Sequence, residues 1–201
     1  EPFLLGYVAR LPLGTPDATR AMLRLADNPY WLGLRTGWHG PGAWRDPAVL
    51  ADIRLLAAQG RALDVLCGPA ALPEILELAL AVPNLRIVID HLGGVKLNGQ
   101  APPADWAGAM TALGQCPGVY CKLSGIPEQG APDSNRLSLA NALPVLHHLL
   151  AAFPPERLVL GSNWPVCTLY ASLAQVHALL AEFLENCPAA SRAHLLGGSA
   201  N

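Results

Sequence analysis

Short apolar runs alternate with longer amphipathic stretches, and this alternation limits the fold more than any other feature of the chain. The apolar runs predict β-strands over residues 3–9, 31–35, 63–66, 86–90, 119–123 and 157–161. Between them, apolar residues recur at spacings of three and four, which predicts helices over residues 16–25, 47–59, 72–82, 103–113 and 143–153. Strands that are apolar on both faces and separated by helices indicate a parallel sheet covered by helices.

The residues that flank these stretches agree with helices. Thr15 and Asp46 each precede a proline, and Ser172 opens the last helical stretch, so each supplies a side-chain oxygen for the free backbone amides of a first turn. Gly60 and Gly114 follow or close helical stretches, where a left-handed residue is common.

Two architectures fit a parallel sheet covered by helices. An open doubly wound sheet usually carries a glycine-rich turn after its first strand, and no G-x-G-x-x-G motif occurs in the sequence. We therefore expect an α/β fold of the TIM (β/α)₈-barrel type. Because about six strand–helix units are found where the barrel needs eight, we expect one incomplete barrel domain over residues 1–201.

Composition excludes several classes of function. The formal net charge is -2 and basic residues are dispersed, which argues against nucleic acid as a partner. Acidic residues interrupt the apolar stretches, so no membrane span is expected. The five cysteines lie far apart without a C-x-x-C pair, which favours a reduced, cytoplasmic protein.

Polar side chains collect where the predicted strands end, which is where the active site of a barrel enzyme lies. They are Arg35, Asp64, His91, Lys122, Ser124 and Asn163. A long loop predicted over residues 125–141 follows one of these strands and is expected to lie over the same end.

Each of these side chains has a functional and a structural interpretation. Arg35 suits a substrate carboxylate or lactone carbonyl, or a salt bridge at the rim. His91 suits a metal or a substrate carbonyl, or a histidine satisfied within the core. Alternation places Lys122 on one face with Tyr120 and Ser124, where it is either a contact for an anionic substrate or a structural charge.

The segment after the last strand is the most informative one. Asn163 is a candidate to orient substrate or water, although a neutral amide is no general base, and its alternative is a turn cap. Trp164 offers a flat wall for a ligand. His39 is expected to be exposed, and the neighbouring His147 and His148 point in different directions on a helix, which disfavours joint metal binding.

Together these segments resemble the lactonase branch of the amidohydrolase-2 family, which includes fuconolactonase-like and pyrone-dicarboxylate-lactonase-like enzymes. The resemblance covers essentially the whole chain and rests on six landmarks in order. They are Gly33-Leu34-Arg35, Leu63-Asp64-Val65-Leu66, Ile89-Asp90-His91-Leu92, Cys121-Lys122-Leu123-Ser124-Gly125, Gly161-Ser162-Asn163-Trp164-Pro165 and Gly197-Gly198-Ser199-Ala200-Asn201.

The resemblance implies a barrel hydrolase that opens a sugar lactone or dicarboxylate lactone. It implies a first-strand H-x-H motif, a histidine like His91 and a last-strand aspartate around the substrate, with a divalent metal in some members. This sequence has no H-x-H, and Asn163 stands at the aspartate position. The resemblance also implies that the N-terminal strands of the barrel are absent and that the C-terminus is slightly shortened. We expect His91 and Asn163 to be catalytic, and the expected substrate-binding residues are Arg35, Lys122, Ser124 and Trp164.

The partner implied is a small lactone or carboxylate, and a homo-oligomer is a further expectation. A zinc-like metal in the full-length protein would take His91 together with upstream ligands, whereas none is expected in this chain alone, which we expect to be inactive by itself. Two alternatives stay open: a decarboxylase of aromatic acids, as in relatives of this barrel, and a catalytically silent barrel or fragment.

Overall fold

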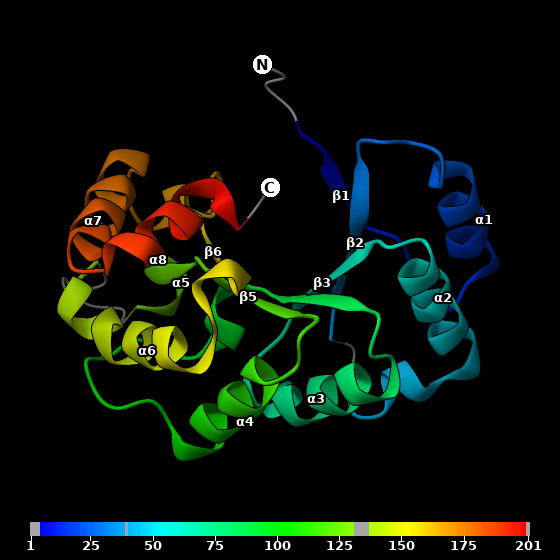
Figure 1. Ribbon diagram of the computed structural model, residues 1–201, viewed down its shortest axis with the longest axis horizontal. Coiled ribbons are helices and arrows are strands. Elements are labelled where there is room, and N and C mark those ends of the chain that lie inside the picture. The colour runs from blue at the N-terminus through cyan, green and yellow to red at the C-terminus, as the bar shows by residue number, and fades with distance from the viewer. Residues whose placement is uncertain (1–4, 39, 131–136, 200–201) are drawn as a thin grey trace.

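The computed structural model describes residues 5–38, 40–130 and 137–199, and its centre is one curled parallel sheet (Figure 1). Its six strands are hydrogen-bonded in chain order, β1 to β6. Their bounds are β1 Tyr7–Ala9, β2 Trp31–Gly37, β3 Ala62–Leu66, β4 Arg86–Ile89, β5 Val119–Leu123 and β6 Leu158–Leu160. The predicted α/β barrel with missing strands is therefore confirmed as an open, curved six-stranded sheet.

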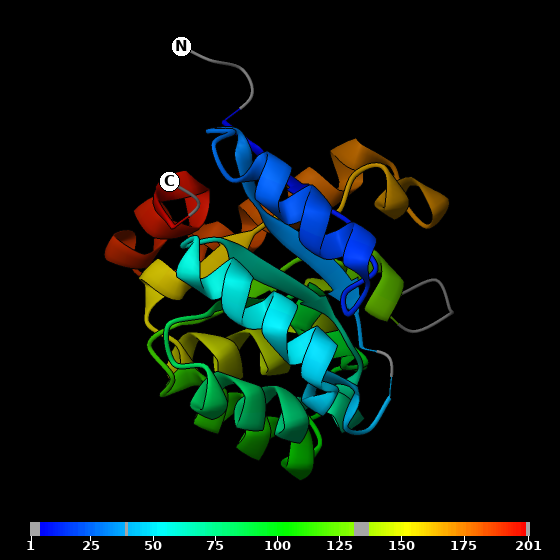
Figure 2. The same cartoon turned by 90° about the vertical axis from the view of Figure 1, so that its right-hand side faces the viewer.

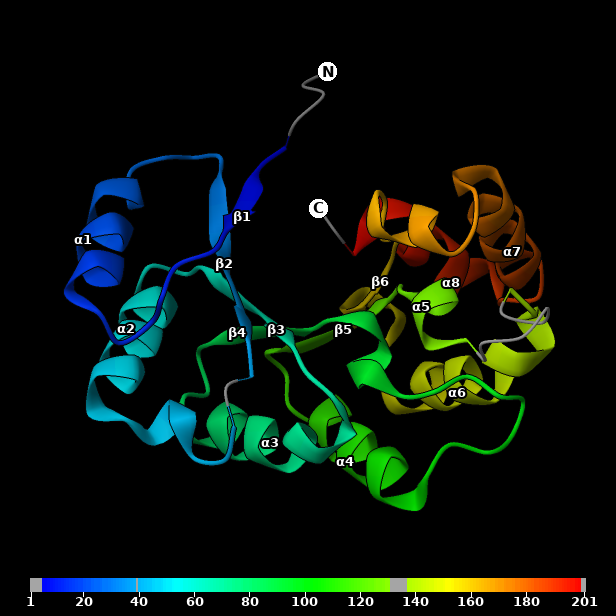
Figure 3. The ribbon, with the colours of Figure 1, turned by 180° about the vertical axis from the view of Figure 1, so that it is seen from behind.

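Helices cover the outer side of this sheet, as the views in Figures 1 and 2 agree. They are α1 Pro16–Leu25, α2 Pro47–Ala58, α3 Leu72–Ala81, α4 Ala104–Gly114, α5 Ile126–Gln129, α6 Leu139–Ala152, α7 Leu173–Glu185 and α8 Ala189–Ala193. Seen from behind in Figure 3, β1 and β6 lie at the two sides of the opening. Each has a single neighbouring strand within the described residues.

Most helix ends follow the sequence signals. The Thr15 hydroxyl accepts a hydrogen bond from the Ala18 amide, and the Asp46 carboxylate accepts from the first turn of α2. Ser172 and Gln175 form a capping box at α7. Gly60 has the predicted left-handed backbone, with φ 64°.

The prediction for Gly114 was wrong, because this residue is the last of α4 and has no positive φ. A Cβ built on Gly114 would lie 2.1 Å from the Ala152 carbonyl oxygen. This glycine therefore allows two backbones to approach closely, which is a different use of the missing side chain.

Three predicted segments differ from the structure by more than two residues. Of the strand predicted over residues 3–9, only Tyr7–Ala9 is β-structure, and residues 3 and 4 lie outside the described residues. The helix predicted from residue 143 begins at Leu139, because the Ser138 side chain caps it. Pro144 therefore lies inside the helix. The loop predicted over residues 125–141 contains α5 and the start of α6, while residues 131–136 lie outside the described part.

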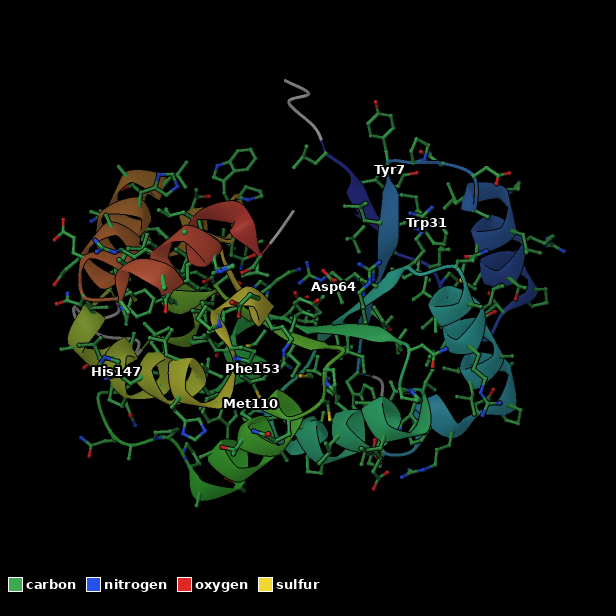
Figure 4. All side chains as sticks on the ribbon, in the orientation of Figure 1. Tyr7, Trp31, Asp64, Met110, His147 and Phe153 are labelled. Carbon is green, nitrogen blue, oxygen red and sulfur yellow. The ribbon has the colours of Figure 1, made fainter. Side chains whose placement is uncertain are left out.

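The hydrophobic core fills the space between the sheet and the helices on its outer side. Its largest fully buried side chains include Trp31, Trp106 and Phe153. Figure 4 shows Asp64 on the other side of the strands from Met110 and Phe153, facing the open concave side of the sheet. Within the described residues, no helix is both long and apolar enough to span a membrane.

The close packing of β2 on β3 gives a stability prediction. A Cβ on Gly33 would lie 2.1 Å from the Ala62 carbonyl oxygen, whereas one on Gly108, in exposed α4 surface, meets nothing within 4 Å. We expect Gly33→Ala to lower the free energy of unfolding by about 1–3 kcal/mol because the strands must move apart. Gly108→Ala, the matched control, should raise it by up to about 1 kcal/mol. Urea denaturation measures both, and equal effects would contradict this packing.

Candidate active site

A row of polar residues faces the concave side of the sheet because the register aligns them. Arg35 of β2 pairs with Asp64 of β3, which pairs with Val88 of β4, and Val88 pairs with Tyr120 of β5. Side chains two residues apart share a face, so Asp90 lies above Val88. Lys122 lies above Tyr120 for the same reason. The ends of four neighbouring strands therefore bring two cations and two carboxylates together.

Asp90 links the two cations of this row. Its side chain has no exposed surface; Oδ2 lies 2.9 Å from Arg35 Nε, and Oδ1 lies 2.9 Å from Lys122 Nζ. Lys122 also pairs with Asp64. Because two positive groups meet two negative ones, the formal charges balance, which a set of buried ionised groups requires. We call Arg35, Asp64, Asp90 and Lys122 the strand-end network.

Burial and pairing act in opposite directions on the titratable groups here. Burial raises the pKa of Asp64 above its usual value, although Lys122 opposes that shift. Burial alone would lower the pKa of Lys122, but Asp64 and Asp90 outweigh it and raise the pKa, so the ammonium stays charged. Burial lowers the pKa of His91, with Asp90 opposing and both cations adding to the effect. His91 is therefore neutral near pH 7.

The neighbours of His91 decide which of its nitrogens carries the proton. Arg35 Nη2 lies 3.2 Å from His91 Nε2, and a guanidinium only donates, so Nε2 must accept. The proton of the neutral ring then lies on Nδ1, which donates to Ser124 Oγ at 2.8 Å. In this tautomer His91 cannot take the proton of Ser124. The pair is a chain of hydrogen-bond donors and not an activated nucleophile.

The backbone holds His91 in an uncommon conformation. His91 and Leu92 have φ of 52° and 61°, a left-handed region that residues other than glycine rarely adopt. The Trp106 indole donates to the Leu92 carbonyl oxygen at 3.0 Å and holds this turn. A Cβ on Gly125 would lie 2.9 Å from His91 Cβ, so the β5–α5 turn packs directly against the imidazole.

A second polar pair lies beyond β6. Asn163, with φ 61°, donates from Nδ2 to Glu128 Oε1 of α5 at 2.9 Å. Glu128 Oε2 is buried and has no hydrogen-bond partner among the described residues. Sequence reasoning does not find Glu128, because the sequence pattern predicts a loop over its segment. Pro127 and Glu128, two and three residues after Gly125, were the available signal for the first turn of a helix.

The remaining residues considered in the sequence are Trp164 and three histidines. Trp164 is 65% exposed beside Asn163. His39 lies outside the described residues. His147 is exposed while His148 contacts the Trp106 ring and the Ala107 carbonyl oxygen, so the expectation that they point apart is confirmed.

The donor atoms near His91 do not fit a metal site by themselves. Both imidazole nitrogens have partners, and the one at Nε2 is a cation. Residues 5–38, 40–130 and 137–199 contain no group of three or more histidine, cysteine, aspartate or glutamate side chains that could hold a metal ion. These residues alone therefore do not form a metal site.

Comparison with known proteins decides the family. The amidohydrolase family model matches residues 2–201. The chain belongs to this amidohydrolase family. An L-fucono-1,5-lactonase of Burkholderia ambifaria is 33% identical over 98% of this chain and 69% of its own length. The prediction of an amidohydrolase-type enzyme from the strand-end landmarks is confirmed.

Solved structures of amidohydrolases carry the same fold. One from Burkholderia multivorans, with bound HEPES, has a TM-score of 0.86 at 26% identity and covers 100% of this chain and 73% of that chain. A second crystal form of a Burkholderia multivorans amidohydrolase, with bound zinc, has a TM-score of 0.83 at 28% identity over 98% and 72% of the two chains. A divalent metal therefore occurs in the family.

A decarboxylase also shares the architecture. The 5-carboxyvanillate decarboxylase of Sphingomonas paucimobilis has a TM-score of 0.63 at 17% identity over 97% of this chain and 65% of its own. At that identity the likeness shows the fold alone.

The strand-end network gives a second stability prediction. Lys122→Met leaves Asp64 and Asp90 without their shared cation, so we expect the free energy of unfolding at pH 7 to fall by about 3 kcal/mol. Lys96 is the other lysine of the chain and is exposed, so Lys96→Met should stay within about 0.5 kcal/mol. Chemical denaturation measures both; a loss of less than about 1 kcal/mol at Lys122 would contradict the network.

Proposed function

We propose that the full-length protein hydrolyses a small lactone by attack of water at the ring carbonyl. The observation that carries this proposal is the Arg35 guanidinium, which is 40% exposed on the concave face while Asp90 and His91 fix its orientation. A cation that is held rigidly and still reaches solvent stabilises the negative charge that develops on a carbonyl oxygen. Similarity to L-fucono-1,5-lactonase supports a sugar lactone as the substrate class.

The other residues of the site have separate roles in this proposal. His91 holds Arg35 and orients Ser124, whose hydroxyl hydrogen remains available after Ser124 accepts from His91. Asn163 positions water, and Trp164 forms one wall for the substrate. Lys122 keeps its ion pairs with Asp64 and Asp90, and together with Arg35 it balances their negative charges.

Two further expectations are part of the proposal. All five cysteines are free thiols, which agrees with a cytoplasmic protein. Burial and Asp90 raise the pKa of Cys67 to about 12, so this thiol near the network is no nucleophile at neutral pH. Any zinc-like metal in the full-length protein would need ligands from beyond the described residues.

Arg35→Lys tests the role of the guanidinium. A lysine keeps the charge, but its single nitrogen lacks the planar fork by which the guanidinium contacts Asp90 through Nε and His91 through Nη2 and still directs further donors to a carbonyl. We expect kcat/KM for a sugar 1,5-lactone to fall about 10- to 100-fold, the equivalent of one charged hydrogen bond. A pH-indicator assay of lactone opening measures this change.

The matched control is Arg24→Lys on the exposed surface of α1, which should leave the rate unchanged. An unchanged rate in Arg35→Lys would contradict the role of Arg35. If the protein releases carbon dioxide from an aromatic carboxylic acid and opens no lactone, its activity is decarboxylation and not lactone hydrolysis.

A further inference from the structure

The structure assigns a proton acceptor to the site: we propose that Glu128 removes the proton from the attacking water and that Asn163 is its positioning residue. This inference rests on the proposed lactone hydrolysis. Attack of water on an ester carbonyl at neutral pH requires a group that takes a proton, and a positioned carboxylate is such a group.

The pair has the geometry that this role needs. Asn163 Nδ2 donates to Glu128 Oε1 at 2.9 Å, which fixes the carboxylate and occupies one of its two oxygens. Oε2 is buried and has no partner among the described residues. An ionised carboxylate only accepts hydrogen bonds, and a buried acceptor without a donor is costly. A water molecule or a substrate hydroxyl that reaches Oε2 would satisfy it.

The other candidate bases of the concave face are already occupied. The two oxygens of Asp90 form ion pairs with Arg35 and Lys122, and Asp64 Oδ2 forms an ion pair with Lys122. His91 Nε2 faces the donors of Arg35. Asn163 carries an amide, which is not basic. Among the described residues, Glu128 Oε2 is the buried carboxylate oxygen that has neither a hydrogen bond nor an ion pair.

Chain connections place Glu128 close to the contact between Gly125 and His91. Gly125 ends the turn after β5 and packs against His91, and α5 begins at the next residue, so Glu128 lies within one helical turn of this contact. On the neighbouring strand, a Cβ on Gly161 would lie 3.7 Å from Ser124 Cβ, two residues before Asn163. The pair and the His91–Ser124 hydrogen bond therefore border the same end of the sheet.

The proposed step balances without any other reactant. Glu128 Oε2 takes one proton from water while the water oxygen forms a bond to the lactone carbonyl carbon. The ring C–O bond then breaks, and the released alkoxide receives that proton from Glu128. The product is the open hydroxy acid, and Glu128 ends as a carboxylate.

The test uses the full-length protein and makes the same substitution, glutamate to glutamine, at two positions. Glu128→Gln keeps a carbonyl oxygen for the Asn163 amide but removes the base. We expect kcat for lactone opening to fall about 100-fold, the lower end of what a general base contributes, with little change in KM. Glu182→Gln, an exposed position on α7, is the matched control and should keep the full rate.

An exchange variant separates catalysis from a structural role. Glu128→Gln/Asn163→Asp moves the carboxylate to the other partner and keeps an amide–carboxylate hydrogen bond, so we expect it to regain at least about tenfold in kcat over Glu128→Gln. A pair that only tethers α5 to the turn after β6 would give full activity in Glu128→Gln. Thermal unfolding of each variant checks that it folds.

The outcomes are distinct. Lactone opening by the unchanged protein together with a kcat within about twofold in Glu128→Gln would overturn the role of Glu128 and leave the proposed function standing. No recovery in the exchange variant would overturn the positioning role of Asn163. If the unchanged protein opens no sugar 1,5-lactone, the proposed function fails and the role of Glu128 with it.

Discussion

Asp90 neutralises two cations that come from different strands, and it does so with no exposed surface of its own. A buried carboxylate is stable only with partners of opposite charge, so Arg35 and Lys122 cannot turn away without leaving an uncompensated charge. Through Lys122 the constraint reaches Asp64 on a third strand. The ends of β2, β3, β4 and β5 are therefore tied together on the face where polar groups collect.

The state of His91 follows from this network. Arg35 is fixed by Asp90, so its guanidinium presents donors to His91 Nε2 and selects the tautomer with the proton on Nδ1. The same contact disfavours a metal at Nε2, because a cation is already there. The left-handed turn after β4 is the cost of this placement, and the Trp106 indole and the closely packed Gly125 hold it in place.

Local signals in the sequence were enough for the strands and most helices, because periodicity and capping residues act within one element. Thr15, Asp46 and Ser172 each cap the helix that they were expected to cap. The pairing of Arg35 and Lys122 with the same aspartate was not predictable, because it depends on the register of four strands. Asp90 itself was taken as part of a strand end and given no role.

The role of Glu128 also depends on a contact between distant segments, which local sequence signals do not indicate. Its contact with Asn163 joins residues 35 positions apart, and nothing in either segment alone indicates it. The sequence did show that an amide stands where a carboxylate was expected, which pointed to a missing base. Only the packing of α5 beside the turn after β6 supplies a candidate for that base.

The protonation of His91 is the most direct test of this account. Nitrogen-15 NMR of the imidazole distinguishes a protonated from an unprotonated ring nitrogen. At pH 6.5, the ordinary pKa of histidine, we expect a mainly neutral His91 with its proton on Nδ1 and none on Nε2. An imidazolium at that pH, or a neutral ring protonated on Nε2, would contradict it.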